Sequence, residues 1–147
     1  MNQSLMSYRG NRAFLGALCL LLAVILVGCG KEIRQDRTVV KKGLVYEMGS
    51  QKPFSGYVVG NGREGYRREA MRYEKRYRMG KLDGLTRYWY DNGQLESVEP
   101  YKDGVIDGVI KRYYENGQVK AKVHFVNGKR GGMRGEKFWD EDGRRKE

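Results

Sequence analysis

Cysteine and histidine are scarce in this sequence, and their scarcity excludes several kinds of site. Two cysteines in 147 residues cannot build a disulfide-rich scaffold or a four-cysteine zinc site. One histidine excludes any site that needs two. The 21 glycines lack the period of three that a collagen triple helix requires. The 11 tyrosines and two tryptophans argue against disorder, because disordered chains are poor in aromatic residues.

The length and the charge of the chain indicate one basic domain. A chain of 147 residues has room for a single domain rather than two. Lysine and arginine number 29 against 18 acidic residues, which gives a formal net charge of +11. The charge is unevenly distributed, since the first 28 residues contain no acidic residue.

The first 28 residues are typical of a secretory signal peptide. Arg9 and Arg12 precede an unbroken run of apolar or small residues from Ala13 to Val27. The run has about 15 residues, fewer than the roughly 20 that a membrane-spanning helix needs. A positively charged start followed by such a run predicts a cleaved targeting segment.

The run ends in Leu26-Val27-Gly28-Cys29, and this ending resembles the bacterial lipobox. The resemblance implies cleavage after Gly28, diacylglycerol on the sulfur of Cys29, and acylation of the new amino terminus. Two or three acyl chains, such as palmitate, would anchor the protein durably in the cell envelope. The membrane would be the outer membrane of a Gram-negative host or the plasma membrane of a Gram-positive host. The alternative is an uncleaved signal anchor in which Cys29 has no role.

Residues 29–39 are expected to form the lipidated cysteine and a polar tether, and residues 40–147 a repeat domain. Basic residues lie close to the expected anchor. They would either be attracted to an anionic leaflet or belong to a solvated linker. These residues are Lys31, Arg34, Arg37, Lys41 and Lys42.

A repeat with a period of 24 residues organises the rest of the chain. Residues 77–84 recur at 101–108, and residues 90–95 recur at the same offset at 114–119. A third copy begins at Phe125 and contains two extra residues before Phe138. A degenerate earlier copy is visible between residues 42 and 56.

These segments resemble the MORN-repeat variant family. The shared pattern is an aromatic residue, an Asn-Gly-Lys-x-Asp-Gly-like turn, and then Tyr-Tyr-x-Asn-Gly-Gln. The resemblance covers about residues 40–147, with departures at residues 60–76 and at Asp140, which replaces a tyrosine. Bacterial proteins of this type carry an antitoxin label (YwqK-like), and many look like lipoproteins. The resemblance therefore implies a binding role, with toxin neutralisation as one form of it.

The turn signals independently predict an all-β fold. Asn92-Gly93 and Asn116-Gly117 lie between strand-forming residues, and such a pair favours a type I′ hairpin turn with positive φ at both positions. Residues 119–125 alternate between apolar and polar side chains, which is typical of a strand. The sequence predicts an antiparallel β-meander of about four 24-residue hairpin repeats, with about eight short strands and no crossover helix. Residues 66–78 fit either a strand or a short helix.

A two-residue loop at Asn116-Gly117 would fix which residues share a face of the sheet. The expected core-face pairs are Tyr114 with Val119, Arg112 with Ala121, and Ile110 with Val123. The expected pairs on the opposite face are Tyr113 with Lys120 and Lys111 with Lys122. By the same rule, Trp89 would lie beside Glu96 and Tyr90 beside Leu95.

The outward face is the candidate binding surface, because aromatic and basic residues recur on it. Aromatic residues and arginine are enriched in protein interfaces, and lysines steer acidic partners. The alternative is that the aromatic residues pack for stability with solvated lysines between them. The candidate residues are Arg87, Trp89, Lys111, Tyr113, Lys120, Lys122 and Trp139, with Lys137 among the neighbouring lysines.

No sequence pattern indicates catalysis or a cofactor. Gly60 to Gly65 matches G-x-G-x-x-G, but a dinucleotide site needs a βαβ unit around it, and the repeat resumes instead. Asp140 to Gly143 resembles a fragment of a calcium loop and is interpreted as a turn. His124 is interpreted as a surface residue. We expect no catalytic residue, no metal, no cofactor and no nucleic-acid partner.

The sequence supports two hypotheses of function. The first is a lipid-anchored, non-enzymatic envelope protein that binds a protein partner, with an acidic protein or a toxin as the expected partner. The second is a structural envelope lipoprotein that contacts peptidoglycan or anionic lipid through its positive charge.

Overall fold

The computed structural model describes residues 30–62, 72–131 and 135–147. The signal peptide expected over residues 1–28 and the lipidation expected at Cys29 lie outside these ranges. The chain divides into two compact units, Met1–Gly30 and Lys31–Glu147, and the architecture below is that of the second. In the described part of the chain, no helix combines the length and the apolar character that a membrane span requires.

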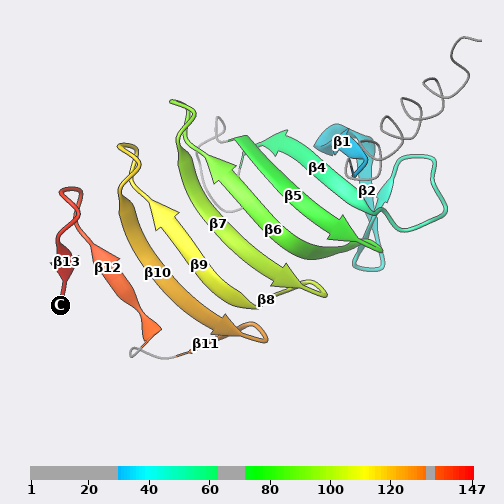
Figure 1. The fold of residues 1–147 in the computed structure, drawn as a ribbon. Helices are drawn as coiled ribbons and strands as arrows, with labels where there is room; N and C mark the ends of the chain where they lie inside the picture. The colour runs from blue at the N-terminus through cyan, green and yellow to red at the C-terminus, as the bar shows by residue number, and fades with distance from the viewer. Residues whose placement is uncertain (1–29, 63–71, 132–134) are drawn as a thin grey trace, which may run out of the picture. The chain divides into compact units, whose positions relative to one another are not determined.

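Antiparallel strands that follow one another in sequence order form most of this unit (Figure 1). The main sheet has the order β1-β4-β5-β6-β7-β9-β10-β12-β13, with β8 paired to β7 and β11 to β10. Strands β2 and β3 pair with each other in a separate hairpin. The predicted all-β, mostly antiparallel meander is therefore confirmed, but the expected number of about eight strands is too low, since the described residues form thirteen. The elements are β1 (Glu32–Arg34), the 3-10 helix η1 (Gln35–Arg37), β2 (Thr38–Lys41), β3 (Leu44–Glu47), β4 (Gly56–Asn61), β5 (Arg72–Arg78), β6 (Lys81–Trp89), β7 (Leu95–Lys102), β8 (Val105–Ile106), β9 (Gly108–Tyr113), β10 (Val119–Val126), β11 (Lys129–Arg130), β12 (Lys137–Trp139) and β13 (Arg145–Lys146).

The first strand of the sheet lies in the stretch where the sequence predicts a tether. Strand β1 pairs in parallel with β4, and Ile33 lies opposite Val58. Ile33, Phe54 and Val58 are buried together in a small apolar cluster. A single apolar residue, Ile33, among charged neighbours is too weak a pattern to predict a strand. Its burial against Val58 nevertheless brings residues 32–34 into the sheet.

Two-residue turns with positive φ at both positions connect successive antiparallel strands at one end of the hairpins. They are Lys42-Gly43, Met79-Gly80, Asp103-Gly104 and Asn127-Gly128, and their φ values lie between 47° and 93°. Positive φ at both central residues defines the type I′ turn, whose twist matches that of the strands. The N–H groups of Gly80, Gly104 and Gly128 donate to the carbonyls of Phe54, Leu82 and Ile106, at 2.7, 2.8 and 2.8 Å. The last three of these turns are thereby joined to the preceding part of the array.

The Asn-Gly turns at the other end of the strands differ from the prediction. Only Gly93 and Gly117 have positive φ, at 83° and 84°. In the second turn, Gly117 N–H donates to Tyr114 O at 2.9 Å, and Tyr114 N–H donates to Gln118 O at 2.8 Å. This is a type I turn followed by a left-handed glycine, so the expected type I′ turn is wrong. The side chain of Asn116 explains the choice, because its Oδ1 accepts the N–H of Gln118 at 2.9 Å.

The longer turn displaces the pairing close to it and leaves the rest of the hairpin as predicted. Val119 pairs with Tyr113, and a bulge separates it from Ala121. Beyond the bulge, the predicted pairs Arg112–Ala121, Lys111–Lys122 and Ile110–Val123 are confirmed. Trp89 pairs with Leu95 for the same reason. The predicted pairs Tyr114–Val119, Tyr113–Lys120, Trp89–Glu96 and Tyr90–Leu95 are therefore wrong.

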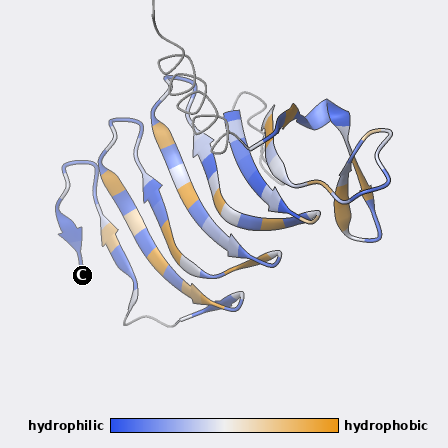
Figure 2. Cartoon of the chain, turned by 45° about the vertical axis from the view of Figure 1, so that its right-hand side comes forward, coloured by the Kyte–Doolittle hydropathy of each residue, from blue (hydrophilic) through white to orange (hydrophobic). Residues whose placement is uncertain are grey.

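The two faces of the sheet differ in burial. Hydrophobic and hydrophilic residues alternate along the long strands (Figure 2). Following the register across the sheet places the buried strand residues on one face. This face includes Arg112, whose Nε is buried and has no hydrogen-bond partner among the described residues. The buried residues of this face are Ile33, Val58, Tyr73, Thr86, Tyr88, Ser97, Glu99, Ile110 and Ala121. We call the opposite face the basic face.

Residues 66–78, for which the sequence fits either a strand or a short helix, form a strand where the structure describes them. Residues 72–78 form β5, and residues 66–71 lie outside the described ranges. Gly60, the first glycine of the G-x-G-x-x-G match, lies in β4 beneath Tyr73. A Cβ at position 60 would come within 2.6 Å of the Tyr73 hydroxyl, so this glycine makes room for a packed tyrosine.

Candidate binding surface

Three lysines lie side by side across neighbouring strands of the basic face. Lys111 of β9 pairs with Lys122 of β10, and Lys122 pairs with Lys137 of β12. Neighbouring strands are separated by about 4.8 Å, so the three side chains start from positions about 10 Å apart in total. Lys111 and Lys137 are exposed, and Lys122 is half-buried. We call these three residues the lysine row.

The lysine row lacks acidic partners among the residues that the structure describes. Glu136, the residue before Lys137, is held by two hydrogen bonds from the guanidinium of Arg130, from Nη2 to Oε2 at 2.5 Å and from Nε to Oε1. These bonds lower the pKa of Glu136, and its carboxylate is paired with Arg130. Like charges that face each other on neighbouring strands destabilise a sheet by roughly 0.2–1 kcal/mol per pair. The row therefore contains like-charge repulsion that no described carboxylate offsets.

Aromatic residues accompany the lysines at the hairpin end of the strands. The ammonium of Lys122 lies 5.5 Å from the centre of the Trp139 ring, and that of Lys120 lies 5.1 Å from the Tyr114 ring. A cation–π contact at an exposed site contributes about 0.5–1 kcal/mol. This gain is of the same size as the repulsion of one lysine pair, so it offsets the repulsion only in part.

Arg87 and Trp89 occupy a different part of the same face and are engaged within the protein. Arg87 Nη1 donates to Glu74 Oε1 at 2.6 Å. The guanidinium of Arg72 lies 4.6 Å from the centre of the Trp89 ring. Val98 of β7 separates Arg87 from Lys111 in the register. Arg87 is thus paired and Arg72 is stacked, whereas the lysines of β9, β10 and β12 have no carboxylate partner among the described residues.

Hydrogen bonds between successive repeats hold this surface in place. Tyr90 Oη donates to Tyr113 O at 2.7 Å, and Tyr114 Oη donates to Trp139 O at 2.8 Å. The asparagine side chains repeat the pattern, since Asn92 Nδ2 donates to Glu115 O at 3.0 Å. Asn116 Nδ2 in turn donates to Glu141 O, also at 3.0 Å. The backbone beside Tyr113 and Trp139 is therefore fixed by the preceding repeat.

Two of the repeats match a known family model. A family model described as MORN repeat variant matches residues 82–103 and 106–127. No curated protein and no solved structure matches the chain. The two matched MORN-variant segments span most of the β6–β7 hairpin and the β9–β10 hairpin, so they supply Arg87 and Trp89 as well as two members of the lysine row.

The structure brings together part of the residue set that the sequence predicts. Lys111, Lys122 and Trp139 are joined by register and by the ring contact. Tyr113 lies two residues beyond Lys111 on the same strand, and Lys120 is the bulge residue beside it. Lys137 completes the row, and its register was not predictable because the third repeat contains two extra residues.

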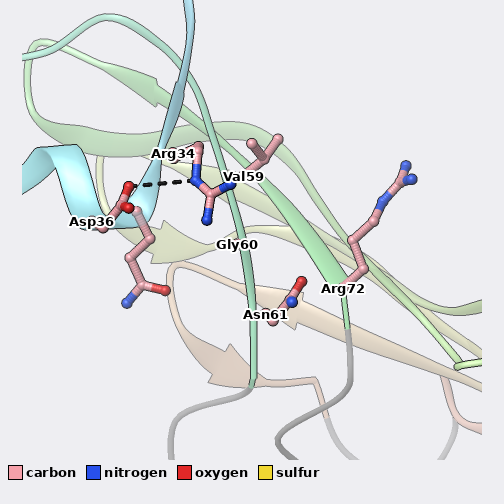
Figure 3. A pocket seen from close by; sticks show the side chains of 7 residues that line it. Arg34, Asp36, Val59, Gly60, Asn61 and Arg72 are labelled. Atoms are coloured by element: carbon pink, nitrogen blue, oxygen red, sulfur yellow. Dashed lines mark ion pairs between the residues drawn. The ribbon is translucent and has the colours of Figure 1, made fainter.

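A hollow of about 560 Å³ lies between β1, η1, β4 and β5 (Figure 3). Arg34 and Arg72 line it, and Arg34 Nε lies 3.6 Å from Asp36 Oδ1. Next to it, Tyr73 donates a hydrogen bond to Gln35 Oε1 and holds η1 against the sheet. Burial, aided by neighbouring Tyr77, raises the pKa of Tyr73 to about 12, so the phenol stays neutral at physiological pH. The described lining of the hollow consists of charged, amide and apolar groups, and no pair of these groups is a nucleophile in contact with a base.

The third repeat closes its turn on itself. Asp140 Oδ1 accepts the N–H groups of Asp142 and Arg144, at 3.1 and 2.8 Å. Asp142 Oδ2 accepts a hydrogen bond from Arg144 Nη1 at 2.9 Å. In the described ranges, no group of three or more acidic, histidine or cysteine residues is placed to hold a metal ion. The calcium-loop fragment is thus a hydrogen-bonded turn.

Proposed function

We propose that this protein is a non-enzymatic binding module of the cell envelope that presents its basic face to an acidic protein partner. Repeats of the matched kind are generally modules for binding. The observation that carries the proposal is the lysine row, whose three positive charges have no acidic partner in the described residues. Binding of carboxylates would relieve the repulsion within the row and would speed association through long-range attraction.

Neutralisation of a toxin, or immunity against one, is the form of this function that the family resemblance implies. Such a role needs a rigid, repeat-built surface rather than catalytic groups. The ladder of tyrosine and asparagine hydrogen bonds between repeats supports this rigidity.

The proposed anchor is the lipidated Cys29, and its support is the Leu-Val-Gly-Cys ending of the short apolar run. Cys29→Ala should abolish fatty-acid labelling and release the protein from the membrane fraction. An alanine variant that stays membrane-bound and uncleaved would show that the segment is a signal anchor instead.

Photocrosslinking in cells tests the binding function. A photoreactive phenylalanine analogue at Tyr113, beside the lysine row, should capture a protein that mass spectrometry can identify. The matched control places the same analogue at Met79, which is 71% exposed at the opposite end of the strands. Capture from Tyr113 but not from Met79 is the expected result. Equal capture from both positions, or no capture, would contradict the proposal.

The structural alternative, contact with peptidoglycan or anionic lipid, depends on basic residues near the expected anchor. Two of these are already paired, since Lys31 contacts Glu47 and Arg34 contacts Asp36. Lys41 lies over the Tyr46 ring at 5.7 Å. Fewer basic side chains near the expected anchor are thus available to bind lipid or peptidoglycan than the sequence indicates, and this favours the hypothesis of a protein partner.

A further inference from the structure

The lysine row lies between two less polar strips of the basic face. Tyr113 and Trp139 lie two residues beyond Lys111 and Lys137, toward the Asn-Gly turns. Val109 lies two residues from Lys111 in the other direction and pairs with His124. Tyr113, Trp139 and Val109 are all partly exposed. Side chains two residues apart on a strand share a face and lie about 6.7 Å apart. The surface is therefore a cationic strip flanked by Tyr113 and Trp139 on one side and by Val109, beside His124, on the other.

The spacing of the lysines distinguishes between possible shapes of a partner. The row runs across the strands, so it advances about 4.8 Å per lysine and about 10 Å over two intervals. On one side of an α-helix, residues three or four apart advance about 5 Å, which gives about 10.5 Å over two intervals. On an extended strand, residues on one side advance about 6.7 Å, which gives about 13 Å. An acidic helix matches the row within about 1 Å, whereas an acidic strand is mismatched by about 3 Å.

From this geometry we infer that the lysine row binds an amphipathic acidic helix of the protein partner, laid across strands β9, β10 and β12. Three carboxylates three or four residues apart face Lys111, Lys122 and Lys137. Apolar side chains on both sides of this acidic ridge contact Trp139 and Tyr113 on one flank and Val109 on the other. The inference rests on the proposed function and names the chemistry of its partner.

The test uses the full-length protein in uncharged detergent and a labelled helical peptide as the probe. The peptide is alanine-rich, about 16 residues long, with glutamates three or four residues apart in one line and leucines on both sides. One control peptide has the same composition with its glutamates distributed around the helix. A second carries the same number of glutamates at alternate positions of a proline-containing extended chain. Fluorescence anisotropy should show binding of the first peptide and at least about tenfold weaker binding of both controls.

Charge reversal separates the lysine row from net charge. Lys111→Glu/Lys122→Glu/Lys137→Glu should weaken peptide binding by about tenfold or more. The matched control Lys81→Glu/Lys102→Glu/Lys129→Glu reverses three exposed lysines at the ends of strands near the type I′ turns and should change binding by less than about twofold. The single change Lys122→Glu should weaken binding while raising the melting temperature, so a loss of binding in this variant is not a loss of fold.

Any of three results would overturn the inference. The first is equal binding of the aligned and distributed glutamate peptides, because recognition would then depend on charge alone. The second is binding of vesicles rich in anionic phospholipid that is lost in Lys122→Glu while the aligned peptide does not bind. If crosslinking from Tyr113 captures a partner that the aligned peptide does not displace, the proposed function stands and the helical partner is wrong.

Discussion

At the scale of single residues, Lys122 is the position where stability and the proposed function oppose each other. It lies between Lys111 and Lys137 in the register, so it takes part in both repulsive contacts of the row. Its only described attraction is the contact with the Trp139 ring. A half-buried residue that weakens the fold is best explained by a ligand that it meets.

Lys122→Glu should stabilise the isolated protein by about 1 kcal/mol. The change turns two repulsive cross-strand pairs into attractive ones, each contributing up to about 1 kcal/mol, and loses one cation–π contact of about 0.5–1 kcal/mol. Chemical denaturation at low salt measures the difference. Lys129→Glu, at an exposed position beside a turn, serves as the control and should leave stability within about 0.5 kcal/mol. Destabilisation by Lys122→Glu would show that the row is not repulsive.

Gly117→Ala should destabilise the protein by about 1–2 kcal/mol, because a side chain resists the φ of +84° that this turn requires. Space is not the obstacle, since a Cβ at position 117 would lie 3.6 Å from the nearest atom, Oε1 of Gln94, which is an ordinary contact distance. Gly131→Ala is the control, because Gly131 has no positive φ and its Cβ would meet His124 at 3.5 Å. Equal melting temperatures for the two variants would argue against the turn geometry.

Tyr73 should make stability depend on pH in the alkaline range. Its pKa is about 12 in the folded protein and about 10 in the unfolded chain, so folding favours the neutral phenol. The contribution is complete below pH 10 and is lost as the pH rises from 10 toward 12. Urea unfolding across this range should show a steeper loss of stability in the wild type than in Tyr73→Phe. Identical slopes would mean that the phenol titrates normally.

At the scale of elements, each hairpin depends on its neighbour through the side chains of its turn. Asn116 has two structural roles. Its Oδ1 accepts the N–H of Gln118 within its own turn, and its Nδ2 donates to the backbone carbonyl of Glu141 in the next turn. Asn92 repeats both contacts one repeat earlier. The asparagine is therefore a link of the array as well as a turn residue.

Asn116→Asp and Asn116→Ala should separate these two functions. Aspartate keeps the acceptor for Gln118 N–H and loses the donor to Glu141, which should cost about 1 kcal/mol. Alanine loses both hydrogen bonds and should cost about 2 kcal/mol. Asp91→Ala, an exposed turn position in the preceding repeat, should cost less than about 0.5 kcal/mol. Thermal melting ranks the variants, and an alanine variant no less stable than the aspartate variant would contradict the double role.

The fold was predictable from the sequence wherever a pattern repeats without interruption. The period of 24 residues and the alternation over residues 119–125 were enough to predict the meander and the register from Ala121 onward. The turn type was not, because Asn-Gly suits both a type I′ turn and a type I turn with a left-handed glycine. The Asn116 side chain decides between them, and its hydrogen bond appears only in three dimensions.

The candidate surface was predictable only in part. The Lys111–Lys122 pair follows from the hairpin, whereas Lys137 joins the row across a repeat with two inserted residues. The ion pair between Arg87 and Glu74 was not predictable, because Glu74 lies in the degenerate segment where the repeat spacing fails. Burial of Ile33 against Val58 was hidden for a similar reason, since one apolar residue forms no periodic pattern.

At the scale of the whole unit Lys31–Glu147, charge is distributed unevenly along the sheet. Around β1, β5 and β6, positive groups are paired with carboxylates or stacked on a ring, as in Lys31–Glu47, Arg87–Glu74 and Arg72–Trp89. Across β9, β10 and β12, the lysine row has no carboxylate partner among the described residues, although Lys122 is stacked on the Trp139 ring. The proposed partner therefore approaches the second half of the array, and the first half supports it.

The association rate of the captured partner, measured at low and at high salt with wild-type protein and with Lys122→Glu, tests this account most directly. Wild-type protein should associate faster at low salt, because the unpaired lysines attract an acidic partner and salt screens that attraction. Lys122→Glu should associate more slowly and with a weaker dependence on salt, although the folded protein is more stable. An unchanged rate and an unchanged salt dependence in Lys122→Glu would contradict the assignment of the lysine row as the binding surface.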